Sequence, residues 1–81
     1  MPPNDDYAMA SIALDAAKAS GAPKVASGYW NRALTSYKEG EDYFEQRNYG
    51  AAQAAFIRAR QNAERAENSA RLQRLRSGEV F

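Results

Sequence analysis

The sequence predicts an all-α fold, a three-helix antiparallel bundle dominated by one long helical hairpin. Apolar residues recur in steps of three and four from Tyr49 to Ala70, which is the spacing of one face of a long helix. A second stretch with this spacing, from Ala26 to Phe44, lies directly upstream. Because only a short segment around Arg47 separates the two stretches, we expect them to fold back on each other as antiparallel helices.

The two stretches have complementary side-chain sizes. The pairs expected to face each other are Phe44 with Ala52, Gly40 with Phe56, Tyr37 with Ala59, Ala33 with Ala63, Trp30 with Ala66 and Ala26 with Ala70. In this register every ring meets a small residue and no ring meets another ring. Such alternation is what dense packing between closely spaced helices requires.

A shorter helix is expected before the hairpin, at residues 5–20. Its apolar stripe is weak and consists of Tyr7, Ala10, Leu14 and Ala17. Asn4 is the expected N-cap of this helix. Gly21 is expected to end it, and Pro23 suits the first turn of the helix that follows.

The two hairpin helices are expected at residues 23–46 and 49–77, and the whole chain, residues 1–81, is expected to form a single domain. Two glycines lie inside the first of these helices, where each costs about 1 kcal/mol relative to alanine. Gly40 has a packing reason, because it receives Phe56. Gly28 has none, so a kink or a later start of the helix is open at that point.

The last helix has recognisable ends. Asn48 is its expected N-cap, and Gly78 is expected to end it. Three arginines near its carboxyl end, Arg71, Arg74 and Arg76, suit the negative end of the helix dipole. Contact with nucleic acid or anionic lipid is the other interpretation, but the pI near 8 and the lack of interleaved aromatic residues disfavour it.

Composition narrows the range of functions. The 81 residues carry a net charge of +1 and include neither cysteine nor histidine. The chain therefore lacks disulfides, thiolate ligands and the commonest general base. We expect no enzyme, no cofactor and no metal, and no small-molecule substrate is evident. We also expect no nucleic-acid partner, since the charge is balanced, and no membrane span, since no apolar run approaches about 18 residues.

Two groups of residues on the hairpin invite a functional interpretation. The first is an acidic cluster that precedes the turn: Glu39, Glu41, Asp42 and Glu45. A divalent cation is one hypothesis, but helical carboxylates alone make poor cages, and we favour a solvated face paired with Lys38. The second is a set of tyrosines that could line a ligand groove: Tyr29, Tyr37, Tyr43 and Tyr49. At helical spacing, aromatic residues are more typical of a core.

The candidate partner-binding site lies at the carboxyl end of the chain. The last helix is expected to extend beyond its partner helix and to expose Leu72 and Leu75, with Val80 and Phe81 following. Apolar residues rimmed by arginine are typical of interfaces, so we expect a protein partner or self-association here. The alternative is that the tail folds back and caps the bundle.

Small and aromatic residues recur in the hairpin at Gly40, Tyr43, Ala52, Phe56 and Ala59. This spacing resembles that of one tetratricopeptide repeat. The hairpin departs from that repeat at Ser36 and Glu39, where large apolar residues are usual, and at Glu64, which replaces the closing proline. No second copy follows at the repeat period, and a solenoid needs about three repeats.

A wider pattern covers most of the chain: a short alanine-rich helix, Gly21-Ala22-Pro23, Tyr29-Trp30, and the alanine seam that carries Ala63-Glu64-Arg65-Ala66-Glu67. It resembles the small alanine-rich helical domain of unknown function found in bacterial envelope lipoproteins, which sometimes precedes an OmpA-like peptidoglycan-binding domain. Neither that second domain nor the lipid-bearing cysteine is in this sequence. The resemblance implies a lipid anchor in the native precursor, with Met1 in place of a removed signal and lipobox, and it supplies no catalytic residues.

These observations lead to one functional prediction and one alternative. The prediction is a non-enzymatic interaction or structural module, the soluble part of a bacterial cell-envelope lipoprotein in the periplasm or at the outer membrane. The alternative is a cytoplasmic tetratricopeptide-like adaptor or oligomerisation module. The gene sequence upstream of Pro2 would distinguish them.

Overall fold

The structure, a computed structural model, describes residues 1–78, and this part of the chain forms four helices and no strand. They are α1 (Asn4–Ala19), α2 (Ala22–Val25), α3 (Ser27–Glu45) and α4 (Tyr49–Arg76). The predicted all-helical fold with a long hairpin is confirmed. The strict three-helix count is wrong, because the first hairpin helix is interrupted at Ala26 and leaves α2 as a separate single turn.

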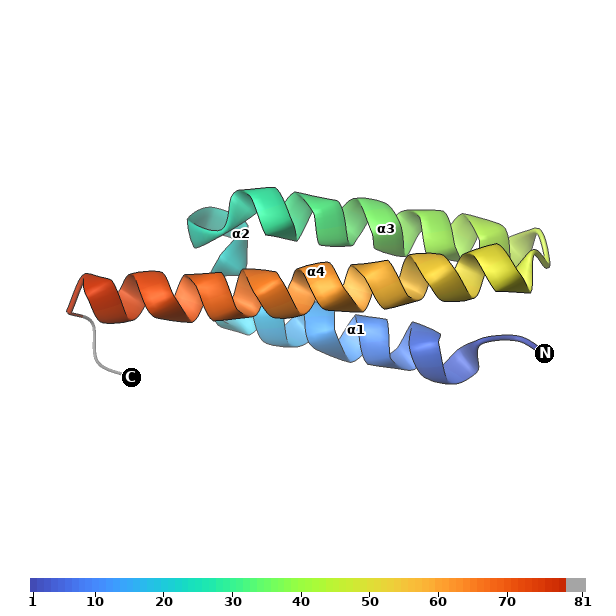
Figure 1. Cartoon of the computed structure of the whole chain (residues 1–81), viewed down its shortest axis with the longest axis horizontal. Helices are drawn as coiled ribbons and strands as arrows, with labels where there is room; N and C mark the ends of the chain where they lie inside the picture. Colours follow the sequence, from blue (N-terminus) through green and yellow to red (C-terminus); the bar gives the residue numbers. More distant parts are fainter. Residues whose placement is uncertain (79–81) are drawn as a thin grey trace.

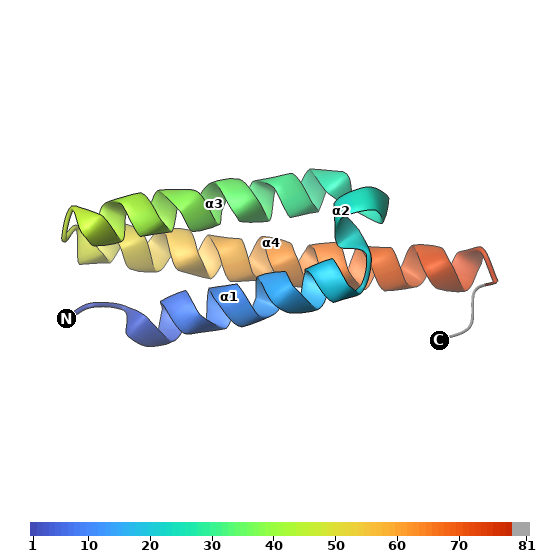
Figure 2. The same ribbon diagram turned by 180° about the vertical axis from the view of Figure 1, so that it is seen from behind.

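The helices form two layers. Figures 1 and 2 show α4 in one layer, nearer the viewer in Figure 1, where it runs between α3 on one flank and α1 on the other. α4 packs against both of these helices, whereas α1 and α3 have few contacts with each other. Since α4 is also the longest helix, it is the central element of a rod that measures 46 × 19 × 13 Å.

The seam of α4 is buried as expected. Its members Ala52, Phe56, Ala59, Ala63, Ala66 and Ala70 are all fully enclosed. The pair between Gly40 and Phe56 is also confirmed, because a Cβ atom on Gly40 would lie 2.6 Å from two atoms of the Phe56 ring. No side chain at position 40 fits unless that ring moves, so α3 and α4 owe their close approach here to the glycine.

The expectation that no ring meets another ring is wrong. Tyr7 of α1 stacks on Phe56, with ring centroids 4.2 Å apart, and makes edge contacts with Tyr37 and Phe44 of α3 at 5.6 and 5.3 Å. Tyr37 and Phe44 in turn contact the Phe56 ring edge-on. Tyr7 reaches these rings because α1 lies along the open side of the hairpin, whereas Tyr37 and Phe44 of α3 contact the Phe56 ring of α4 directly.

The turn of the hairpin is a Schellman motif, in which backbone bonds close the end of α3. Arg47 adopts the left-handed conformation, with φ 61°, and its N–H donates to the carbonyl of Phe44 at 3.0 Å. The N–H of Asn48 donates to the carbonyl of Tyr43 at 2.9 Å. Asn48 also caps α4 as expected, since its side-chain oxygen accepts from the N–H of Ala51 at 3.4 Å.

The connection from α1 to α3 explains two further glycine positions, Gly21 and Gly28. Gly21 ends α1 in the left-handed conformation, with φ 85°, as predicted. Ala26, with φ −131° and ψ 50°, breaks the predicted helix, and α3 starts at Ser27. Gly28 thus lies in the first turn of α3 and is exposed, so the later start of the helix accounts for it.

The apolar stripe predicted on α1 faces the core of the bundle. Ala10, Leu14 and Ala17 are buried, and Tyr7 is half-buried within the ring cluster. The expected N-cap role of Asn4 is wrong. Asn4 is already helical, Pro3 is the preceding cap residue, and no side chain caps the first turn.

Candidate functional site

The carboxyl end of α4 extends past the single turn of α2, as Figure 1 shows. On this extension Leu72 is 53% exposed and Leu75 is 62% exposed. Neither leucine belongs to the two core clusters of buried residues. Val80 and Phe81, the other two predicted site residues, lie outside the described residues. The role of all four in partner binding stays a prediction.

A shallow groove of about 350 Å³ adjoins Leu72, between the start of α3 and the end of α4. Tyr29 of α3 forms one wall, and Arg65, Leu72 and Arg76 of α4 contribute to the other. The guanidinium of Arg32 lies over the Tyr29 ring, 5.7 Å from its centroid. The groove therefore combines an aromatic surface, a leucine and cationic rims, which suits a polar protein surface with some apolar groups.

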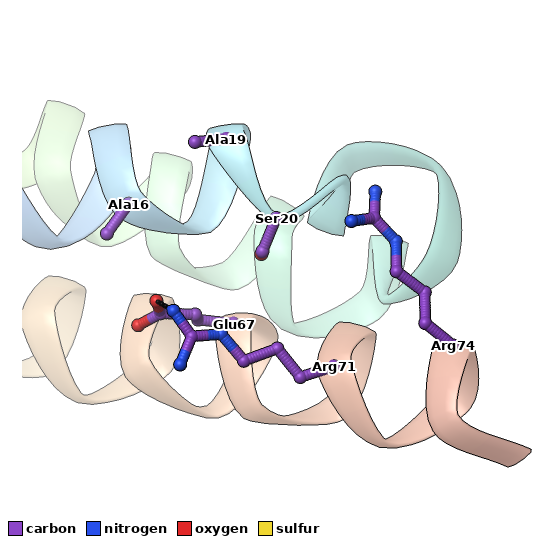
Figure 3. Close-up of a pocket in the computed structure, with 6 residues that line it drawn as sticks. All are labelled: Ala16, Ala19, Ser20, Glu67, Arg71 and Arg74. Carbon is purple, nitrogen blue, oxygen red and sulfur yellow. Dashed lines mark hydrogen bonds and ion pairs between the residues drawn. The ribbon is translucent and has the colours of Figure 1, made fainter. Parts of the chain in front are cut away.

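A second cleft, of about 380 Å³, lies between the carboxyl end of α1 and α4 (Figure 3). Arg71 donates to the Glu67 carboxylate at 2.7 Å within it, so this pair neutralises itself. Arg74 reaches toward the connection after α1, and a Cβ atom on Gly21 would collide with its guanidinium. This cation sits at the negative end of the α1 dipole.

The role of Arg74 goes beyond the sequence-based interpretation. That interpretation related the arginine only to the end of its own helix, whereas the structure also places it against the end of α1. No spacing rule within one helix could have found this contact, because it depends on how far α4 extends along α1. Its chemistry is structural: it joins the end of α1 to the extension of α4.

The acidic cluster near the turn is divided by the fold. Glu41 accepts a hydrogen bond from the Tyr7 hydroxyl at 2.5 Å, which ties α1 to α3. This bond, followed by burial of the ring, raises the pKa of Tyr7 well above its usual range. Within residues 1–78 no group of three or more acidic side chains is placed to hold a metal ion.

The four tyrosines also separate. Tyr37 and Tyr43 pack against the buried cluster around Phe56, and Tyr49 contacts the Phe44 ring at 5.6 Å between centroids. Tyr29, in contrast, lines the groove beside Leu72. A continuous tyrosine-lined ligand groove is therefore not formed in the part of the chain that the structure describes.

No known protein family, curated protein or solved structure matches this chain. Among residues 1–78, no helix combines the length and the apolar character that crossing a membrane requires. What the geometry offers is an exposed surface, made by the outer side and the carboxyl end of α4.

Proposed function

We propose that this chain is a non-enzymatic interaction module that binds a protein partner through the exposed carboxyl third of α4. The observation that carries the proposal is the exposure of Leu72 and Leu75 on a helix that extends beyond its neighbours. Exposing two large apolar side chains at adjacent turns of one helix to water costs free energy, and burying them against a partner recovers it. The arginines around them provide the polar rim that such docking surfaces have.

We further propose that the module is the soluble part of a bacterial cell-envelope lipoprotein. The support is the resemblance in the alanine-rich first helix, Gly21-Ala22-Pro23, Tyr29-Trp30 and the alanine seam. A tetratricopeptide-like cytoplasmic adaptor is the second candidate, favoured by the close packing of Gly40 against Phe56. A signal peptide and lipobox upstream of Pro2 in the gene would decide for the envelope, and a continuous cytoplasmic reading frame would decide for the adaptor.

Binding through the leucines is tested with the double variant Leu72→Ser and Leu75→Ser. The control is Ile12→Ser, which removes an apolar residue of α1 that is at least as exposed as the two leucines. We expect cross-linking of the full chain to its partner to be lost in the double variant and retained in the control, with little change in melting temperature. If binding persists while the melting temperature falls sharply, the leucines are core residues and the proposal is wrong.

A further inference from the structure

α4 carries a second stripe of side chains on the side turned away from α1 and α3, which faces the viewer in Figure 1. We call it the outer stripe, and its members are Ala54, Ile57, Gln61, Glu64, Arg65, Asn68, Leu72 and Leu75. Ile57 is half-buried and the other members are exposed. Steps of three and four residues connect them, so they share one helix face, opposite the alanine seam.

The outer stripe is complementary to itself in antiparallel order. If a second copy lies across it, centred between positions 64 and 65, the facing pairs are Ala54 with Leu75, Ile57 with Leu72, Gln61 with Asn68 and Glu64 with Arg65. A leucine then meets the alanine, which is the smallest side chain of the stripe, and each amide meets an amide. Two carboxylates and two guanidinium groups gather at the twofold axis, whereas a parallel copy would align each charge with its own kind.

The charges of the whole rod favour the same arrangement. Carboxylates gather at the end that holds the hairpin turn: Asp5, Asp6, Glu39, Glu41, Asp42 and Glu45. Cations gather at the opposite end: Lys18, Lys24, Arg71, Arg74 and Arg76. An antiparallel second copy places the acidic end of each molecule beside the basic end of the other, which is favourable at moderate salt.

We infer that the partner of the outer stripe is a second copy of this chain, bound antiparallel with Ala54 facing Leu75 of the other copy. This inference rests on the proposed function, because it names the partner of the same leucines. The contact runs along about 32 Å of helix, from residue 54 to residue 75. One helix pair of this length buries less than a standard interface, so we expect a dissociation constant on the order of 10–100 µM.

Glu64 has a competing partner within its own chain. Its carboxylate lies 3.7 Å from the Arg60 guanidinium, one turn earlier on α4. Such an exposed pair on one helix contributes little to stability, so it opposes the approach of a second copy only weakly. The central charges therefore set the direction of the dimer, and the apolar pairs toward its two ends provide most of the affinity.

Sedimentation equilibrium across the expected concentration range tests the dimer, and a charge-pair cycle tests its register. Ala54→Glu alone and Leu75→Lys alone should each raise the dissociation constant at least about tenfold, since each removes an apolar contact. The double variant should recover to within about threefold of the wild type, because each new glutamate faces a new lysine. Ile12→Ser should dimerise as the wild type does.

Cysteine variants give an independent readout, because the chain contains no cysteine. Arg65→Cys lies at the twofold axis and should form an intermolecular disulfide under mild oxidation. Leu75→Cys should not form one by itself, since its two copies lie about 31 Å apart along the helix axis. A mixture of the Ala54→Cys and Leu75→Cys variants should form the mixed disulfide.

The possible outcomes separate this inference from the proposed function. A monomeric wild type at the highest concentration overturns the inference. If another protein is then still cross-linked through Leu72 and Leu75, the proposed function stands. A dimer in which Leu75→Cys cross-links to itself is parallel, and it overturns the register. A dimer that survives all outer-stripe variants uses another face and overturns the inference, whereas the proposed function is decided by the binding of another protein through Leu72 and Leu75.

Discussion

Gly40 is the residue on which the close approach of α3 and α4 depends. We predict that Gly40→Ala destabilises the domain by about 1–3 kcal/mol, because the new methyl group displaces the Phe56 ring from a packed position. Gly28→Ala is the matched control, since its methyl group meets nothing within 4 Å. Urea denaturation should show a lower midpoint for the first variant and an equal or higher midpoint for the control. A Gly40→Ala protein as stable as the wild type would disprove the packing.

The Tyr7 hydroxyl makes stability depend on pH in the alkaline range. The bond to Glu41 and the burial of the ring raise the pKa of Tyr7 in the folded state, so the folded state holds this proton more tightly than the unfolded chain. The stabilisation is complete below the unfolded pKa of about 10 and is lost as the pH rises beyond it.

We predict that Tyr7→Phe lowers the melting temperature at about pH 8 and that the difference from the wild type shrinks above about pH 10. Melting followed by circular dichroism across this range measures it. Tyr29→Phe is the control, because it removes an exposed hydroxyl and leaves the bond between Tyr7 and Glu41 in place. A Tyr7→Phe difference that stays constant across the range would show that the folded state does not hold the Tyr7 proton more tightly than the unfolded chain does.

Among the connections between helices, the turn at Arg47 stores backbone strain. A residue with a side chain costs about 1–2 kcal/mol in the left-handed conformation, and glycine does not. We predict that Arg47→Gly stabilises the domain by about 0.5–1 kcal/mol, after the greater entropy of glycine in the unfolded chain is subtracted. Arg47→Ala removes the same side chain and should give no such gain. Equal midpoints in urea for the two variants would count against the strain.

Helix α1 is predicted to open locally before the hairpin does. It buries Ala10, Leu14 and Ala17 and adds the Tyr7 ring, but it has few contacts with α3, whereas α4 is packed on both sides. Local opening is easiest where buried apolar contact is least. Hydrogen exchange should be faster in residues 8–17 than in residues 52–63. Slower exchange in α1 would mean that the ring cluster around Tyr7 makes α1 more resistant to local opening than the hairpin is.

Comparison of the helices with the sequence pattern shows what periodicity can predict. The seam from Tyr49 to Ala70, its partner on α3 and the Gly40–Phe56 pair follow from spacing alone, since two facing helices must alternate in side-chain size. The place of Tyr7 does not follow, because a weak stripe on a short helix does not specify which groove receives it. The break at Ala26 does not follow from spacing either, since alanine favours a helix and only Gly28, two residues later, indicates a later start.

Only those parts of the candidate site that depend on a single helix could be predicted from the sequence. The exposure of Leu72 and Leu75 follows from the greater length of the last helix. The contribution of Tyr29 to the groove beside Leu72 depends on the start of α3, and the position of Arg74 depends on the end of α1. Both are relations between elements, and no pattern within a single helix encodes them.

For the molecule as one body, we expect Phe56 to contribute more to stability than any other side chain. It is the largest side chain that is fully buried within the described residues. We predict that Phe56→Ala costs about 3–5 kcal/mol, which is about the whole stability of a domain of this size, so the variant should be unfolded at 25 °C. Circular dichroism measures the loss of helix. Phe44→Ala, at a half-buried ring, is the control and should remain folded. A helical, cooperatively melting Phe56→Ala protein would contradict this.

The alanine seam of α4 also reverses the usual pattern of evolutionary constraint. In most cores the typical harmful substitution replaces a large side chain by a smaller one. Nearby residues then fill the resulting cavity only in part. Here the side chains of the seam are single methyl groups, so little volume can be removed. A larger side chain at Ala52, Ala59, Ala63 or Ala66 would push the neighbouring helices apart. Selection on these positions therefore sets an upper limit on size. Descendants of this sequence can exchange alanine for glycine or serine along the seam, but they can admit a larger residue only together with a compensating loss of volume in the facing helix.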